Sequence, residues 1–194
     1  PDDEKRALEI AEASVTVVRN DGGVLPLEAE KPLRILHILM PDELGVPPEE
    51  LARREIDVET VALEHEVTAA QEEEILATVD DFTHILVSAS FYREPISESL
   101  VGLLEKLAET DVPVIVVSFG DPYLLRDLPD VPVYICAFGT SSTSRRAATS
   151  ALFGEIEVTG KLPVTLSEEN AVGRGIEIPR RAMTLRTARP EDVG

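Results

Sequence analysis

The residues best suited to contact a ligand lie in two short stretches, each of which follows an apolar run. Residues 90–95 read Ser-Phe-Tyr-Arg-Glu-Pro, and residues 40–43 read Met-Pro-Asp-Glu. An aromatic ring beside an arginine and a carboxylate could hold a sugar or a carboxylate ligand. The alternative is a surface loop whose Phe91 packs locally or docks on another domain. The side chains predicted to contact a substrate are Ser90, Phe91, Tyr92, Arg93 and Asp42.

Other kinds of site find little support in the sequence. It contains no Gly-x-Gly-x-x-Gly, no P-loop lysine and no Gly-x-Ser-x-Gly. The hydroxyl-rich stretch 139–143 is interpreted as a helix N-cap and not as a catalytic loop. The three histidines, His37, His65 and His84, have no second histidine at metal-ligand spacing, and Cys136 stands alone in an apolar run. Structural or surface roles are therefore expected for all four, and neither a metal nor a cofactor is indicated.

The charge excludes some partners. The 194 residues carry 18 Lys and Arg against 37 Asp and Glu, a net charge of −19. Nucleic acid and anionic membranes would be repelled, and no apolar run has the length of a membrane span. Residues 1–140 carry a net −20 and residues 141–194 a net +1. Abundant acid with only four lysines suits a protein that stays soluble in concentrated salt, and a generic acidic surface is the alternative.

These candidate residues must be positioned by alternating apolar strands and amphipathic helices. Continuous apolar runs predict strands buried on both faces, which is typical of a parallel sheet between two helical layers. The expected fold is a three-layer α/β/α sandwich with a mainly parallel, flavodoxin-like, doubly wound sheet of order 2-1-3-4-5 plus an edge strand. Strands are predicted at 33–40, 57–63, 85–90, 112–119 and 131–138, with the edge strand at 162–166; helices are predicted at 4–14, 48–54, 68–81, 97–110, 121–128 and 143–153.

The chain divides into three parts by composition. Residues 1–32 contain a helix and a β-branched run and are expected to lead in from a preceding domain. Residues 33–167 hold the alternating pattern and form the sandwich. Residues 168–194 contain five arginines with weak periodicity, so we expect a tail that wraps the surface or links to a following domain.

Three segments carry a resemblance to a known family. Residues 13–27 (ASVTVVRNDGGVLPL) combine an apolar run with Arg-Asn-Asp-Gly and Leu-Pro-Leu, and residues 118–125 read SFGDPYLL. Residues 152–155 (LFGE) are followed by TGKLPVTL at 159–166. In this order and spacing the segments resemble the second, C-terminal α/β sandwich domain of glycoside hydrolase family 3, and the Asp121-Pro122-Tyr123 turn resembles its β-N-acetylglucosaminidase branch.

The resemblance implies a multidomain parent enzyme. In the family, a preceding barrel domain holds the nucleophilic Asp, and the O-glycoside hydrolysis is retaining. The β-N-acetylglucosaminidase branch takes its proton donor, a His, from the barrel. The β-glucosidase branch takes a Glu from the loop after the third strand, where Glu94 is the only match. The resemblance thus implies an accessory domain, without catalytic activity alone, that buttresses the barrel and contributes to a carbohydrate cleft.

Two further readings stay open. Residues 185–194 (LRTARPEDVG) resemble the segment that leads into penicillin-binding-type serine hydrolase domains, which implies such a domain after Gly194. The chain could alternatively be an independent flavodoxin-like module that binds a carbohydrate or a small anion.

Overall fold

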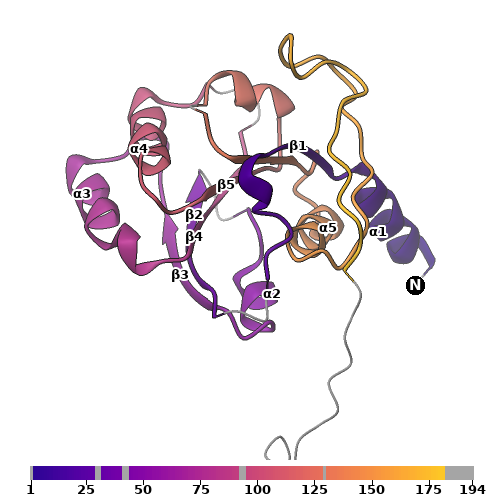
Figure 1. Ribbon diagram of the computed structural model, residues 1–194, viewed down its shortest axis with the longest axis horizontal. Helices are drawn as coiled ribbons and strands as arrows, with labels where there is room; N and C mark the ends of the chain where they lie inside the picture. The colour runs from indigo at the N-terminus through magenta and orange to yellow at the C-terminus, as the bar shows by residue number, and fades with distance from the viewer. Residues whose placement is uncertain (1, 29–31, 41–43, 92–94, 129, 182–194) are drawn as a thin grey trace, which may run out of the picture.

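The computed structural model describes residues 2–28, 32–40, 44–91, 95–128 and 130–181. A six-stranded sheet forms its middle layer (Figure 1). The strand order is β1-β6-β5-β4-β2-β3. Strands β2 to β6 are parallel, and β1 pairs with β6 antiparallel. The order 2-1-3-4-5 expected for the five parallel strands is confirmed. The strands are β1 (Thr16–Asn20), β2 (Arg34–Met40), β3 (Asp57–Ala62), β4 (His84–Ala89), β5 (Val114–Ser118) and β6 (Val133–Cys136).

Helices cover both faces of the sheet, because side chains alternate along each strand and both sets are apolar. On β2, Leu36 and Ile38 belong to one buried cluster and Ile35 to the other. The first cluster lies under α3 (Ala69–Thr78), α4 (Glu98–Ala108) and the 3₁₀ helix η3 (Pro122–Arg126). The second lies under α1 (Asp2–Ser14), α2 (Pro48–Ala52) and α5 (Ser142–Leu152). Two further 3₁₀ turns are η1 (Asp21–Gly23) and η2 (Val79–Asp81).

Polar side chains begin three of these helices. The Thr68 side chain accepts a hydrogen bond from the Gln71 backbone N–H and completes a capping box before α3. The Ser97 hydroxyl accepts from the backbone N–H of Leu100 at the start of α4. Ser141 does the same for α5, accepting from Ser144 N–H. The interpretation of residues 139–143 as a helix N-cap is therefore confirmed.

The edge strand is not where the sequence placed it. Residues 162–166 form no strand, and the strand beside β6 is β1. Pro163 has no N–H to offer to a ladder. Leu162 N donates to Arg174 O at 2.7 Å and Leu166 N to Asn170 O at 2.8 Å, so the segment pairs with the chain that follows it. The edge position falls instead to the β-branched run of β1.

Residues 154–181 lie against α1, β1 and α5, and we call this contact region the seam (Figure 1). Val17 bridges Ile176, and Val158 bridges Ile178, both antiparallel. A Cβ added to Gly160 would lie 2.1 Å from Val15 O, so this close backbone approach requires glycine. Among the described helices, none combines the length and the apolar character needed to cross a membrane.

Candidate functional site

Ligands of doubly wound sheets bind beyond the carboxyl ends of the parallel strands. Here that edge is held together by backbone hydrogen bonds between successive strand ends. Ser90 N donates to Met40 O at 2.9 Å, and Phe119 N donates to Ala89 O at 2.8 Å. One strand further along, Ala137 N donates to Ser118 O at 2.8 Å. The loops after β4 and β5 therefore start side by side from a rigid edge.

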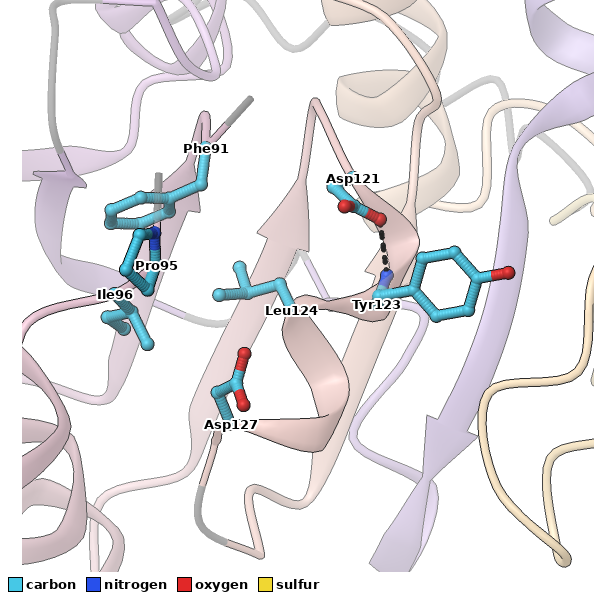
Figure 2. A pocket seen from close by; sticks show the side chains of 7 residues that line it. All are labelled: Phe91, Pro95, Ile96, Asp121, Tyr123, Leu124 and Asp127. Atoms are coloured by element: carbon cyan, nitrogen blue, oxygen red, sulfur yellow. Dashed lines mark hydrogen bonds between the residues drawn. The ribbon is translucent and has the colours of Figure 1, made fainter. Parts of the chain in front are cut away.

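A cavity of about 240 Å³, which we call the rim pocket, opens between these two loops. Figure 2 shows Phe91, Pro95 and Ile96 on one side, facing Leu124 of η3 on the other. The Tyr123 ring points away from Phe91 and Leu124. Together, these groups provide apolar walls with acceptor groups near them. The residues that line the pocket are Phe91, Pro95, Ile96, Asp121, Tyr123, Leu124 and Asp127.

The wall from η3 is fixed by its own turn. Asp121 Oδ1 accepts from Tyr123 N at 2.8 Å, which caps η3, and the Ser118 hydroxyl donates to Asp121 O at 3.0 Å. Asp121 N donates to Phe91 O at 3.1 Å and joins the two loops. The guanidinium of Arg126 lies 4.4 Å from the centre of the Tyr123 ring, so one face of the ring is already covered.

The opposite wall is held by the segment that follows β3. His65 Nε2 lies 3.0 Å from Pro95 O, within hydrogen-bond distance. Val67 N donates to Ser99 Oγ at 2.9 Å, and the Ser99 hydroxyl donates to Glu66 Oε2 at 2.8 Å. These contacts tie the end of the loop after β4, and the first turn of α4, to the neighbouring loop.

The structure describes only part of the predicted substrate contacts. Ser90 and Phe91 are 6% and 5% exposed, and Phe91 lines the rim pocket. Asp121, Tyr123 and Asp127 were not among the predicted site residues, although Asp121 and Tyr123 belong to the segment 118–125 that carries the family resemblance. The predicted strand order could have indicated them, because the order 2-1-3-4-5 places the loops after the third and fourth parallel strands side by side. Four other candidates, Asp42, Tyr92, Arg93 and Glu94, lie outside the described residues.

Three buried titratable side chains of the sheet, His37, Tyr134 and Cys136, do not line the rim pocket. His37 is fully buried, with Nε2 2.9 Å from Ser88 Oγ, and burial lowers the pKa of its imidazole to about 4. Ser88 Oγ also accepts from Val46 N at 3.0 Å. Burial, and secondarily the charge of Asp121, raise the pKa of the Cys136 thiol. Burial also raises the pKa of Tyr134, whose hydroxyl donates to Pro122 O at 3.4 Å. The predicted buried place of Cys136 is confirmed.

The arrangement suits binding more than bond making. The carboxylates of Asp121 and Asp127 are able to accept hydrogen bonds from the hydroxyl groups of a ligand, and the apolar wall is able to pack against the C–H face of a sugar ring. Within the described ranges, no group of three or more His, Cys, Asp or Glu side chains could hold a metal ion.

The chain resembles known proteins both in sequence and in three-dimensional structure. No model of a protein family matches it. A β-N-acetylglucosaminidase/β-glucosidase from Cellulomonas fimi is 28% identical over 189 residues, covering 84% of this chain and 32% of that protein. A solved glycoside hydrolase family 3 β-N-acetylglucosaminidase from Paenibacillus sp. str. FPU-7 is 25% identical, with a TM-score of 0.69, and the match covers 82% of this chain and 32% of that one.

A third match shares the fold at lower sequence identity. A β-glucosidase from Listeria innocua, solved with laminaribiose, is 16% identical with a TM-score of 0.66, over 84% of this chain and 26% of that one. The chain thus spans about a third or less of the length of these proteins. The resemblance stated from residues 13–27, 118–125 and 152–166 is confirmed. Over part of their length, the chain is thus similar to a β-N-acetylglucosaminidase/β-glucosidase and to a glycoside hydrolase family 3 β-N-acetylglucosaminidase.

Proposed function

We propose that this chain is the accessory α/β domain of a larger retaining glycoside hydrolase of the β-N-acetylglucosaminidase type. Its catalytic barrel, in the same polypeptide, would supply the nucleophilic Asp. The observation that carries the proposal is coverage, since the chain corresponds to 32% of each of two β-N-acetylglucosaminidase relatives. In this role the chain buttresses the barrel and does not hydrolyse glycosides by itself.

The carboxyl edge of the sheet is the part of the domain that we assign to the substrate cleft. Asp121 and Asp127 offer carboxylate oxygens to sugar hydroxyls, and Phe91 with Leu124 offers an apolar wall. Tyr92, Arg93 and Asp42 belong to the loops that follow strands at this edge, and we keep them as proposed substrate contacts. Glu94 remains a low-ranking alternative for the acid/base, because the resemblance favours the branch that takes this group from the barrel.

An independent carbohydrate-binding module is the second candidate. It is favoured by the open rim pocket, which exists without any partner domain. A small anion suits this pocket less than a sugar does, because two carboxylates and no basic side chain line its described wall. A binding survey with chitin and cellulose oligosaccharides separates the candidates: a module binds them as an isolated chain, and a buttress does not.

The proposed place in the cleft is tested in the polypeptide that carries this chain with its barrel. Replacing Asp127 by Asn should raise KM for a chromogenic β-N-acetylglucosaminide about fivefold, the effect of losing one charged hydrogen bond, and leave kcat within about twofold. The matched control is Asp111→Asn, because Asp111 is an exposed aspartate in the loop that precedes β5, at the opposite edge. Equal KM values for the two variants would remove the pocket from the cleft.

A further inference from the structure

Helix α4 contains a glycine that the chain's own packing does not explain. Gly102 is the fifth residue of α4, and a helix-interior glycine destabilises a helix relative to alanine. A Cβ added to Gly102 would meet nothing within 4 Å. The described neighbours of Gly102 therefore do not require a glycine at this position. Among the described residues, none occupies the space next to Gly102.

That space is part of a groove of about 360 Å³, which we call the α4 groove. The positions 98, 101, 102 and 105 share one helical face, since they are spaced by three or four residues. Pro95 and Ile96 form the end of the groove at the start of α4, and Asp127 closes its far side. Val101 and Ile96 give it a partly buried apolar floor. The lining residues are Pro95, Ile96, Glu98, Val101, Gly102, Glu105 and Asp127.

The charge of the α4 groove indicates which kind of partner it could bind. Glu98 and Glu105 flank Gly102 one turn before and one turn after it, and both are exposed. Asp127 adds a third carboxylate, and no basic side chain lines the described groove. The nearest lysine on the helix, Lys106, is paired with Glu72 of α3. The groove therefore presents an apolar centre between negative charges, which complements an apolar side chain between positive ones.

We propose that the α4 groove docks a basic polypeptide segment of a partner protein, with an apolar side chain over Val101 and the backbone close to Gly102. Lysines or arginines on either side of that side chain would pair with Glu98 and Glu105. A second copy of this chain is a poor occupant, because both copies carry a net charge of −19. The α4 groove shares Pro95, Ile96 and Asp127 with the rim pocket. The inference does not depend on the proposed glycosidase role, since Glu98, Gly102 and Glu105, on which it rests, do not line that pocket.

The first test is calorimetric titration of the whole chain with a synthetic amphipathic helical peptide of about 14 residues, built from Leu and Lys. Saturable binding is expected. Gly102→Leu should weaken the binding about tenfold or more by filling the contact, while Gly102→Ala weakens it a few-fold. Because the open space tolerates either side chain, both variants should keep the wild-type circular dichroism spectrum. Wild-type affinity in a folded Gly102→Leu variant overturns the proposal.

A matched pair of charge variants separates the groove from general attraction to an acidic protein. The double variant Glu98→Lys/Glu105→Lys should lose at least about tenfold in affinity. The control Glu73→Lys/Glu74→Lys changes the net charge equally on the exposed side of α3 and should lose far less. Equal losses would show unspecific attraction and overturn the proposal, as would stronger peptide binding by a chain truncated after residue 181, which would make the Arg-bearing tail the occupant.

Discussion

The two faces of the sheet are closed in different ways. On the face of α1, α2 and α5, the chain covers itself, because the seam lays residues 154–181 against α1, β1 and α5. On the face of α3, α4 and η3, three hollows are open: the rim pocket, the α4 groove and a hollow of about 120 Å³ beside α3. A wider, shallow hollow of about 620 Å³ lies at the edge of the seam, between β1 and residues 169–176. The difference therefore lies in the covering: residues 154–181 add a further layer over the first face, and no described segment does so over α4.

Glycines show this difference most directly. In the seam, a Cβ on Gly160 would lie 2.1 Å from Val15 O, and one on Gly175 would lie 2.2 Å from Gly160 O. On α4, a Cβ on Gly102 would touch nothing. The same residue type is thus required by internal packing on one face and unexplained by it on the other. The comparison predicts opposite effects for the same substitution.

The largest effect is expected in the seam. Gly160→Ala should lower the free energy of unfolding by about 3 kcal/mol, because backbone atoms of β1 must move to admit the methyl group. Urea denaturation of the variant measures it. A loss below about 0.5 kcal/mol would mean that the seam yields easily and that the two faces are alike.

A smaller effect on the same face depends on pH. The pKa of His37 is about 4 in the folded chain against 6.5 for a free imidazole, so below pH 6.5 the unfolded chain binds the extra proton. The free energy of unfolding should therefore fall as the pH is lowered, by about 2 kcal/mol between pH 7 and 5. In His37→Leu this contribution is absent. Denaturation curves of both proteins across this range test it, and parallel pH profiles would contradict it.

The smallest effect has the opposite sign and lies on α4. Gly102→Ala should raise the free energy of unfolding of the isolated chain by about 0.5–1 kcal/mol, the difference in helix propensity. Thermal unfolding beside the wild type measures the gain. Destabilisation would show that internal packing does need this glycine, and the contrast between the two faces would then disappear.

Much of the sheet was predictable because its signals are local. Continuous apolar runs marked β2, β4, β5 and β6, and caps such as Thr68 and Ser97 marked helix starts. The edge was mistaken because residues 15–20 and 162–166 are both short and apolar, and only long-range pairing decides between them. The pairing of β1 with β6 joins residues more than one hundred positions apart, which no local pattern reveals.

A pocket lies at the edge of the sheet where the sequence predicted the candidate site, and its lining was predicted only in part. The rule for doubly wound sheets led to the carboxyl edge, and Phe91 indeed lines the rim pocket. The residues from η3 were missed as lining because a short 3₁₀ helix has no periodic pattern that shows which side chains face a neighbouring loop. The α4 groove was missed for a related reason, since an unneeded glycine is visible only when its surroundings are known.

We propose that this chain accompanies a catalytic domain and does not replace one. The measurement that tests it most directly is hydrolysis of a chromogenic β-N-acetylglucosaminide and a β-glucoside by the purified 194-residue chain, beside the longer polypeptide with its barrel. We expect release by the longer polypeptide and no release above buffer by the chain alone. Turnover by the chain alone that disappears in Glu94→Gln would contradict the account.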